Sequence, residues 1–243
     1  MKATDIITDT INRLPKGYIF TYGDFTPVVK SKEAIIKALN RLVEKDKIKK
    51  LSKGRYYKAE QSPFGDLHPP QQQVVKDLLQ SGVKLIGYLT GYSIYNQLGL
   101  TTQVSNTIQI GRNEIRPSFK RGIYVIKFIR QKNVITENNI PLLQLLDCMR
   151  TIKNIPDTTI ADSCKQIASL LKALDIEDLR SLTRLSKKYP PATRALLGSI
   201  LDFIKVNPDR KILLNSLNPI TTYDYPGISE TLGKQIENWN IKS

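Results

Sequence analysis

Apolar residues recur at helical spacing in two stretches of the first fifty positions. Isoleucines from Ile6 to Ile11 and then Leu14 follow a 3.6-residue period, which predicts an amphipathic helix over residues 4–14 with Thr4 as its cap. Ile35, Leu39 and Leu42 predict a second helix over residues 31–46, opened by Ser31. Between them, we expect Thr21 and Asp24 to form a capping box at the start of a short helix.

A lysine-rich hairpin is predicted directly after the second long helix. Gly54 suits its tight turn because glycine adopts a positive φ at low steric cost. Tyr56 and Tyr57 begin the return strand, and we expect one to face the core and the other to face solvent. Residues 18–20 are expected to pair with this strand. Helix, turn, helix and basic two-stranded wing follow one another as in a winged helix-turn-helix domain, predicted over residues 1–60.

Such a domain places its polar helix face and its wing against DNA. Asn40 could bond an adenine, Arg41 a guanine or a phosphate, and the amino end of the helix a phosphate. An ordinary solvated face is the alternative, and winged helices also serve protein contacts. The predicted DNA-binding residues are Lys30, Ser31, Lys32, Lys37, Asn40, Arg41, Lys49, Lys50, Lys53 and Arg55.

The rest of the chain predicts a larger mixed domain, so the expected fold class is α+β. Residues 61–70 contain three prolines and no periodicity, and they are interpreted as a linker. In the predicted C-terminal domain, 71–243, residues 71–132 read as mixed α/β. They include a helix over 71–80, a helix capped by Thr90, and strands over 107–111 and 122–129. Residues 140–206 predict four amphipathic helices that form a bundle, and 212–214 a short strand.

Positive charge is concentrated in the front of the chain. The formal net charge of +15 divides into +7 for residues 1–62, +6 for 63–132 and +2 for 133–243. This distribution favours a polyanion, most simply nucleic acid, as partner. A second basic patch, either a solvated loop or a further nucleic-acid backbone contact, is formed by Arg112, Arg116, Lys120 and Arg121.

Chemistry-bearing motifs are scarce. The phosphate-loop, nucleophile-elbow and zinc-protease patterns are absent, and the single histidine, His68, lies in the predicted linker. Cys148 and Cys164 are expected to be reduced and buried. The sequence therefore predicts no enzyme, catalytic residue, metal or cofactor. A metal nuclease is an alternative, with Asp162 and Lys165, or Asp175, Glu177 and Asp178, as its candidate residues. The last three also suit the start of a helix, where acidic side chains favour the helix dipole. No signal peptide or membrane-length apolar run is present, so we expect a cytoplasmic protein without a membrane partner.

Three short segments carry a resemblance to a known family. They are Thr21-Tyr22-Gly23-Asp24-Phe25, Ala38-Leu39-Asn40-Arg41-Leu42-Val43 and Gly54-Arg55-Tyr56-Tyr57, and together they resemble the N-terminal domain of AbiEi-type antitoxins of bacterial abortive-infection toxin–antitoxin pairs. Residues 87–92 and 98–103 are similar to the start of the antitoxin region in the same group. The turn at residues 44–47 lacks the glycine that relatives more often have.

The resemblance implies a DNA-binding antitoxin that represses its own operon and counters a nucleotidyltransferase toxin, with or without direct contact. A winged-helix regulator that responds to a ligand or oligomerises is the alternative. The operator, the toxin, the oligomeric state and the role of residues 133–243 stay open.

Overall fold

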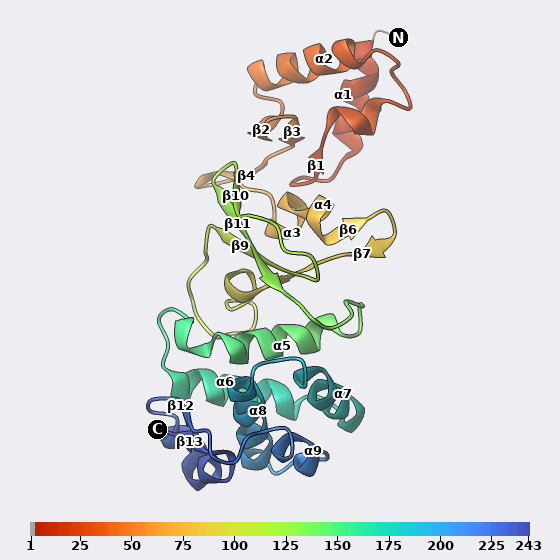
Figure 1. Ribbon diagram of the computed structural model, residues 1–243. Coiled ribbons are helices and arrows are strands. Elements are labelled where there is room, and N and C mark those ends of the chain that lie inside the picture. The colour runs from red at the N-terminus through yellow and green to blue at the C-terminus, as the bar shows by residue number, and fades with distance from the viewer. Residues whose placement is uncertain (1–2) are drawn as a thin grey trace. The chain divides into compact units, whose positions relative to one another are not determined.

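The chain is a mixed α+β protein of two compact units (Figure 1). The computed structural model describes residues 3–243. The first unit comprises Met1–Asp77 and Phe119–Val125, and the second comprises Leu78–Ser118 and Ile126–Ser243. Both units are therefore discontinuous in sequence, and the division falls after the predicted linker.

The helices of the first unit follow the sequence pattern closely. Helix α1, Ala3–Arg13, buries Ile7 and Ile11, but it already includes Thr4, which is therefore not its cap. The capping box of the short 3₁₀ helix η1, Tyr22–Phe25, is confirmed, since the Thr21 N–H donates to the Asp24 carboxylate at 2.7 Å. Ser31 caps helix α2, Lys32–Glu44, by accepting from the Ala34 N–H at 3.2 Å.

A three-stranded antiparallel sheet completes this helical pair. Its strands are β1 (Ile19–Phe20), β2 (Lys49–Ser52) and β3 (Arg55–Tyr57), in the order β1-β3-β2. Gly54 supplies the turn between β2 and β3 with φ +74°, and Asp46 takes a left-handed φ of 55° in the corner that lacks a glycine.

Both tyrosines of β3 are buried, so the prediction that one faces solvent is wrong. Tyr56 stacks on Phe20 in the core, with ring centroids 6.4 Å apart. The other face of the sheet is covered as well, because the loop at Gly122 lies against the Leu51 carbonyl. A segment some seventy residues away in sequence thus covers the hairpin, and local periodicity cannot reveal it.

Residues 60–79 are more structured than the sequence predicts. Strands β4 (Glu60–Ser62) and β5 (Gly65–Leu67) form a hairpin within the predicted linker, and Gly65 makes its turn with φ +109°. The single helix expected over 71–80 is broken at Val75 into α3 (Gln71–Val74) and α4 (Lys76–Leu79).

The largest sheet of the described residues has four strands. Its order is β10-β11-β9-β8, from β8 (Tyr88–Thr90), β9 (Thr107–Arg112), β10 (Phe119–Arg121) and β11 (Tyr124–Arg130). The short strands β6 (Gln80–Ser81) and β7 (Lys84–Leu85) pair separately. The helix expected after Thr90 is only the 3₁₀ turn η2 (Gly91–Ser93), because the Thr90 hydroxyl bonds to Asp147 and does not cap.

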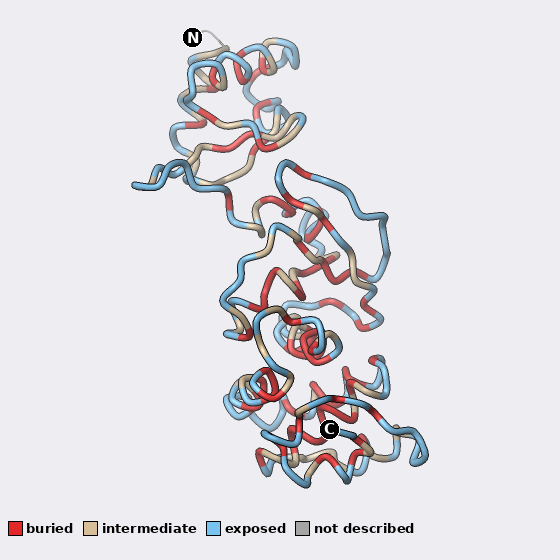
Figure 2. Tube along the Cα trace, turned by 90° about the vertical axis from the view of Figure 1, so that its left-hand side faces the viewer, coloured by how far each residue is buried: buried red, intermediate tan, exposed pale blue. Residues whose placement is uncertain are grey.

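The four predicted bundle helices are confirmed as α5 (Ile140–Arg150), α6 (Ile160–Lys172), α7 (Ile176–Ser186) and α8 (Pro191–Phe203). They contribute most of the larger core, visible as buried stretches in Figure 2. The 3₁₀ segment η3 (Ile152–Asn154) lies between α5 and α6.

The C-terminal segment packs onto α8. It consists of α9 (Arg210–Leu214), β12 (Tyr223–Asp224), α10 (Ser229–Leu232), η4 (Gly233–Trp239) and β13 (Ile241–Lys242), with β12 and β13 parallel. The strand predicted over 212–214 is wrong, since these residues lie in α9, where Leu213 is fully buried. Trp239 fits against Gly198, where a Cβ would lie 2.3 Å from the indole. No helix within residues 3–243 is long and apolar enough to span a bilayer.

Candidate nucleic-acid interface

The first unit carries a set of exposed basic side chains without acidic partners. Lys37 and Arg41, four residues apart, lie on the face of α2 opposite its buried stripe. Lys50 and Lys53 are exposed on the β2–β3 hairpin. None of these four has an ion pair with any residue of the part of the chain that the structure describes. We refer to these four residues as the free cations.

The amino end of α2 adds further polar groups. Lys30 and Lys32 are exposed there, and the Lys32 ammonium lies 4.6 Å from the centre of the Tyr22 ring. The Ser31 hydroxyl oxygen accepts a hydrogen bond from the Ala34 N–H, so Ser31 has a structural role as the N-cap of α2.

Asn40 is exposed on α2, and its side-chain oxygen accepts one hydrogen bond within the protein. The Tyr56 hydroxyl donates to it at 3.3 Å. A bidentate contact with adenine needs both the oxygen and the amide N–H groups of asparagine. The oxygen has a second lone pair, so Asn40 can keep the bond from Tyr56 and still make the full adenine contact.

Two of the predicted DNA-binding cations are engaged within the protein. Lys49 bonds Asp46 at 2.5 Å and Asp66 at 2.8 Å, and these two carboxylates raise the pKa of Lys49 above its usual range. Arg55 bonds Asp77 at 2.8 Å. Both differ from the free cations, because contact with a phosphate would compete with an existing ion pair.

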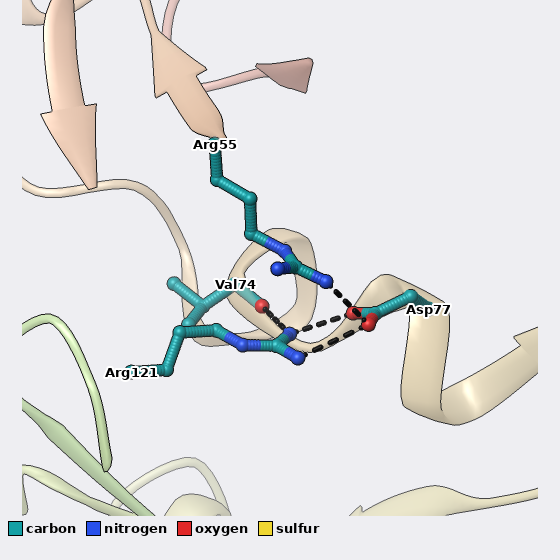
Figure 3. Close-up of polar contacts among 4 residues, drawn as sticks. All are labelled: Arg55, Val74, Asp77 and Arg121. Atoms are coloured by element: carbon teal, nitrogen blue, oxygen red, sulfur yellow. Dashed lines mark hydrogen bonds and ion pairs between the residues drawn. The ribbon is translucent and has the colours of Figure 1, made fainter. Parts of the chain in front are cut away.

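Arg55 belongs to a four-residue cluster inside the first unit (Figure 3). Arg121, with its side chain only 6% exposed, donates to both Asp77 oxygens at 2.6 and 3.0 Å and to the Val74 carbonyl at 2.6 Å. Burial raises the pKa of the Asp77 carboxyl, but bonds from Arg121 and Arg55 outweigh it and lower the pKa overall. Asp77 thus holds the hairpin, through Arg55, to the segment that carries Arg121.

The predicted second basic patch does not form one surface within either unit. Arg121 is buried in the cluster of Figure 3, and Arg112 is only 5% exposed. Burial lowers the pKa of Arg112, whose Nε and Nη1 have no hydrogen-bond partner within residues 3–243. Arg116 and Lys120 are exposed, but they belong to different units.

A buried polar network in the second unit was missed by sequence reasoning. The Asp147 carboxylate is 2% exposed and accepts hydroxyl bonds from Tyr88 and Thr90 at 2.7 Å and from Tyr189 at 2.8 Å. The Gln131 amide donates to both tyrosine oxygens at 2.8 Å. An acidic residue inside the apolar run of α5 was the available signal, since a buried carboxylate needs hydrogen-bond donors.

The carboxylates considered for catalysis have local structural roles. Asp175 caps α7 by accepting the Asp178 N–H at 2.8 Å, and Glu177 pairs with Arg180 at 2.8 Å. Asp162 accepts a bond from the Thr159 hydroxyl, which caps α6. No group of three or more His, Cys, Asp or Glu residues able to hold a metal is found in residues 3–243.

The two cysteines are free and buried in the larger core. Burial raises the pKa of the Cys164 thiol to about 12, and it also raises that of Cys148. His68 is exposed beside the β4–β5 hairpin.

These features define a two-unit α+β protein whose smaller unit presents unpaired basic side chains on a helix and a hairpin. The chain belongs to a family of unknown function, DUF6088, whose model matches residues 6–179. No curated protein matches the sequence.

A solved structure shares the fold. The crystal structure of the RV2827C protein from Mycobacterium tuberculosis is similar with a TM-score of 0.57, over 90% of this chain and 83% of that chain, at 14% sequence identity. At this identity the likeness concerns the fold alone.

Proposed function

We propose that the first unit is a winged helix-turn-helix that binds double-stranded DNA, and that the whole chain is an antitoxin of the AbiEi type. In this proposal α2 enters the major groove, the β2–β3 hairpin is the wing, and the protein represses its own operon. The second unit then counters a nucleotidyltransferase toxin, by direct contact or by another route.

The observation that carries the DNA-binding part is that the free cations have no ion-pair partner within residues 3–243. Lys37 and Arg41 follow one another on the outward side of α2, and Lys50 and Lys53 lie on the hairpin that comes next in the chain. Since no carboxylate of the described chain pairs with them, phosphates can neutralise them without breaking an ion pair found there. The succession α1, β1, η1, α2, β2, β3 also matches a winged helix.

The antitoxin part rests on the resemblance of the three short motifs. Their residues have clear structural roles, since Thr21 and Asp24 form the capping box and Gly54 makes the hairpin turn. The motif residues therefore support the proposed fold of the first unit. The proposed antitoxin activity depends on the family resemblance alone.

DNA binding is tested by measuring the affinity of the full chain for the DNA upstream of its gene at several salt concentrations. Lys53→Ala should weaken binding to all sequences and reduce the slope of log K against log salt by about 0.9 for one lost phosphate contact. Lys172→Ala, an exposed substitution on α6, is the matched control. An unchanged slope for Lys53→Ala would contradict the role given to the hairpin.

Antidote activity is tested by co-expression with the neighbouring gene. Growth should stop when the neighbour is induced alone and recover when the full chain is induced with it. Recovery by a Lys37→Ala, Lys53→Ala double variant would separate antidote activity from DNA binding. A harmless neighbour would instead favour the ligand-responsive or oligomerising regulator.

A further inference from the structure

A cleft of 340 Å³ opens on the second unit along α7 and the start of α9. Its polar walls include Arg180, Arg184 and Lys187 from the α7 side and Asp209 from the α9 side, with Ile212 as an apolar contact. All of these residues belong to one unit. Neither the motif resemblance nor the DNA-binding proposal uses this region.

The cations of the cleft follow one face of α7. Their spacing of four and three residues places the three side chains in a row along the helix. Glu177 pairs with Arg180, and Arg184 donates only to the Ser181 hydroxyl, at 3.5 Å. Across residues 3–243, neither Arg184 nor Lys187 has an acidic partner within ion-pair distance.

The sequence that forms much of the cleft is also rich in basic residues. No acidic residue occurs from 179 to 201, whereas that stretch contains Arg180, Arg184, Lys187, Lys188 and Arg194. This is unexpected in the part of the chain that is nearly neutral overall. Two carboxylates, those of Glu177 and Asp209, also line the cleft, so its three cations leave an excess of one positive charge.

A buried hydroxyl adds a second observation. Thr183 lines the cleft while being only 1% exposed, and its hydroxyl has no hydrogen-bond partner within the described chain. Buried side-chain hydroxyls are nearly always bonded, because an unpaired one loses its bonds to water without replacement. A small local movement on binding would let this hydroxyl donate to a ligand oxygen.

We propose that this cleft binds the phosphate group of a small phosphorylated molecule, of which a nucleotide is the source that best fits its size. Arginine and lysine with a hydroxyl donor match the several acceptor oxygens of a phosphate. The cleft volume lies in the range of small-molecule sites and exceeds what a phosphate alone needs. The remaining space, with Ile212 and the Asp209 acceptor, suits a sugar hydroxyl and an apolar ring face.

Calorimetric titration of the full chain with inorganic phosphate, AMP and adenosine tests the proposal. AMP is expected to bind and adenosine to bind at least tenfold more weakly, because the phosphate supplies the contacts with Arg184 and Lys187. Equal affinity for phosphate and AMP would identify free phosphate as the ligand, and tighter AMP binding would identify a nucleotide. Absence of binding by both phosphate and AMP would overturn the proposal.

Two variants locate the binding. Arg184→Gln should weaken AMP binding about tenfold, whereas Lys172→Gln on α6 should leave it unchanged. Thr183→Val should weaken AMP binding severalfold without lowering the unfolding midpoint, since the hydroxyl has no hydrogen-bond partner within residues 3–243 to lose. AMP binding that survives Arg184→Gln unchanged would place the ligand elsewhere and overturn the assignment, whatever the behaviour of Thr183→Val.

Discussion

The buried carboxylate of Asp147 accepts hydrogen bonds from three hydroxyl groups of the second unit. Burial raises the pKa of its carboxyl, while bonds from Tyr88, Thr90 and Tyr189 act in the opposite direction. Tyr88 and Thr90 belong to β8, and Tyr189 lies in the connection between α7 and α8, so the carboxylate links a strand and this connection to α5. A polar group at this point orients the core as well as stabilising it.

Asp147→Asn should destabilise the second unit by about 2–4 kcal/mol, because the amide N–H groups would face hydroxyls that now donate to a carboxylate. Trp239, the single tryptophan of the chain, is fully buried in this unit and reports its unfolding in urea by fluorescence. Glu237→Gln, an exposed change in the same unit, is the control. Equal midpoints for wild type and Asp147→Asn would show that the network contributes no net stability.

At the same scale, the two buried cysteines are predicted to resist thiol labelling at pH 8. Both thiols are buried with raised pKa values, that of Cys164 to about 12, so the thiolate is scarce in the folded state at pH 8. We expect a thiol-specific reagent to label neither within minutes under native conditions, and to label both at once in guanidinium. Rapid labelling of one thiol in the native protein would place that cysteine at an open surface.

At the scale of single elements, acidic residues pair with half of the four basic side chains of the β2–β3 hairpin. Asp46 and Asp66 hold Lys49, and Asp77 holds Arg55, so part of the positive charge of the hairpin is internally compensated. The remaining charge is that of Lys50 and Lys53. Sequence alone counts all four as equivalent, and only the fold separates them.

Asp77→Asn should release Arg55 for contact with DNA. The expected result is severalfold tighter binding and a salt slope steeper by about 0.9, at the cost of a less stable Arg121 site. Asp9→Asn on α1 makes the same change in net charge at an exposed ion pair and serves as the control. If both variants bind DNA equally well, the effect is one of net charge, and the pairing of Arg55 does not limit binding.

Elements whose signals are local could be predicted from the sequence. The helices α1 and α2, the Thr21 capping box and the Gly54 turn depend on periodicity and short-range bonds, and they were predicted within a few residues. Thr90, by contrast, has the features of a cap, but its hydroxyl bonds Asp147 fifty-seven positions away. For the candidate site, the residue types were predictable, whereas the acidic partners of Lys49 and Arg55 depend on tertiary contacts.

At the scale of the whole molecule, the first unit is not a separable N-terminal block. It includes residues up to Asp77 and also Phe119–Val125. The intervening residues Leu78–Ser118 belong to the second unit. The returning segment supplies Arg121 to the Asp77 cluster and places Gly122 against the Leu51 carbonyl. The DNA-binding surface proposed for α2 and the hairpin therefore depends on residues that follow the predicted domain boundary at position 60.

A fragment of residues 1–60 should consequently fold less well than the same residues in the full chain. It lacks the partners of Arg55 and uncovers Leu51 and Tyr57, which are 8% and 6% exposed in the intact protein. Burial of two such side chains contributes about 1.5–3 kcal/mol each, a large share of the stability of so small a core. We expect poorly dispersed amide NMR signals from the fragment and at least tenfold weaker DNA binding than the full chain shows. A well-dispersed fragment with full affinity would show that residues 61–77 and 119–125 add nothing to the folding of the DNA-binding surface, and that the boundary read from the sequence is the functional one.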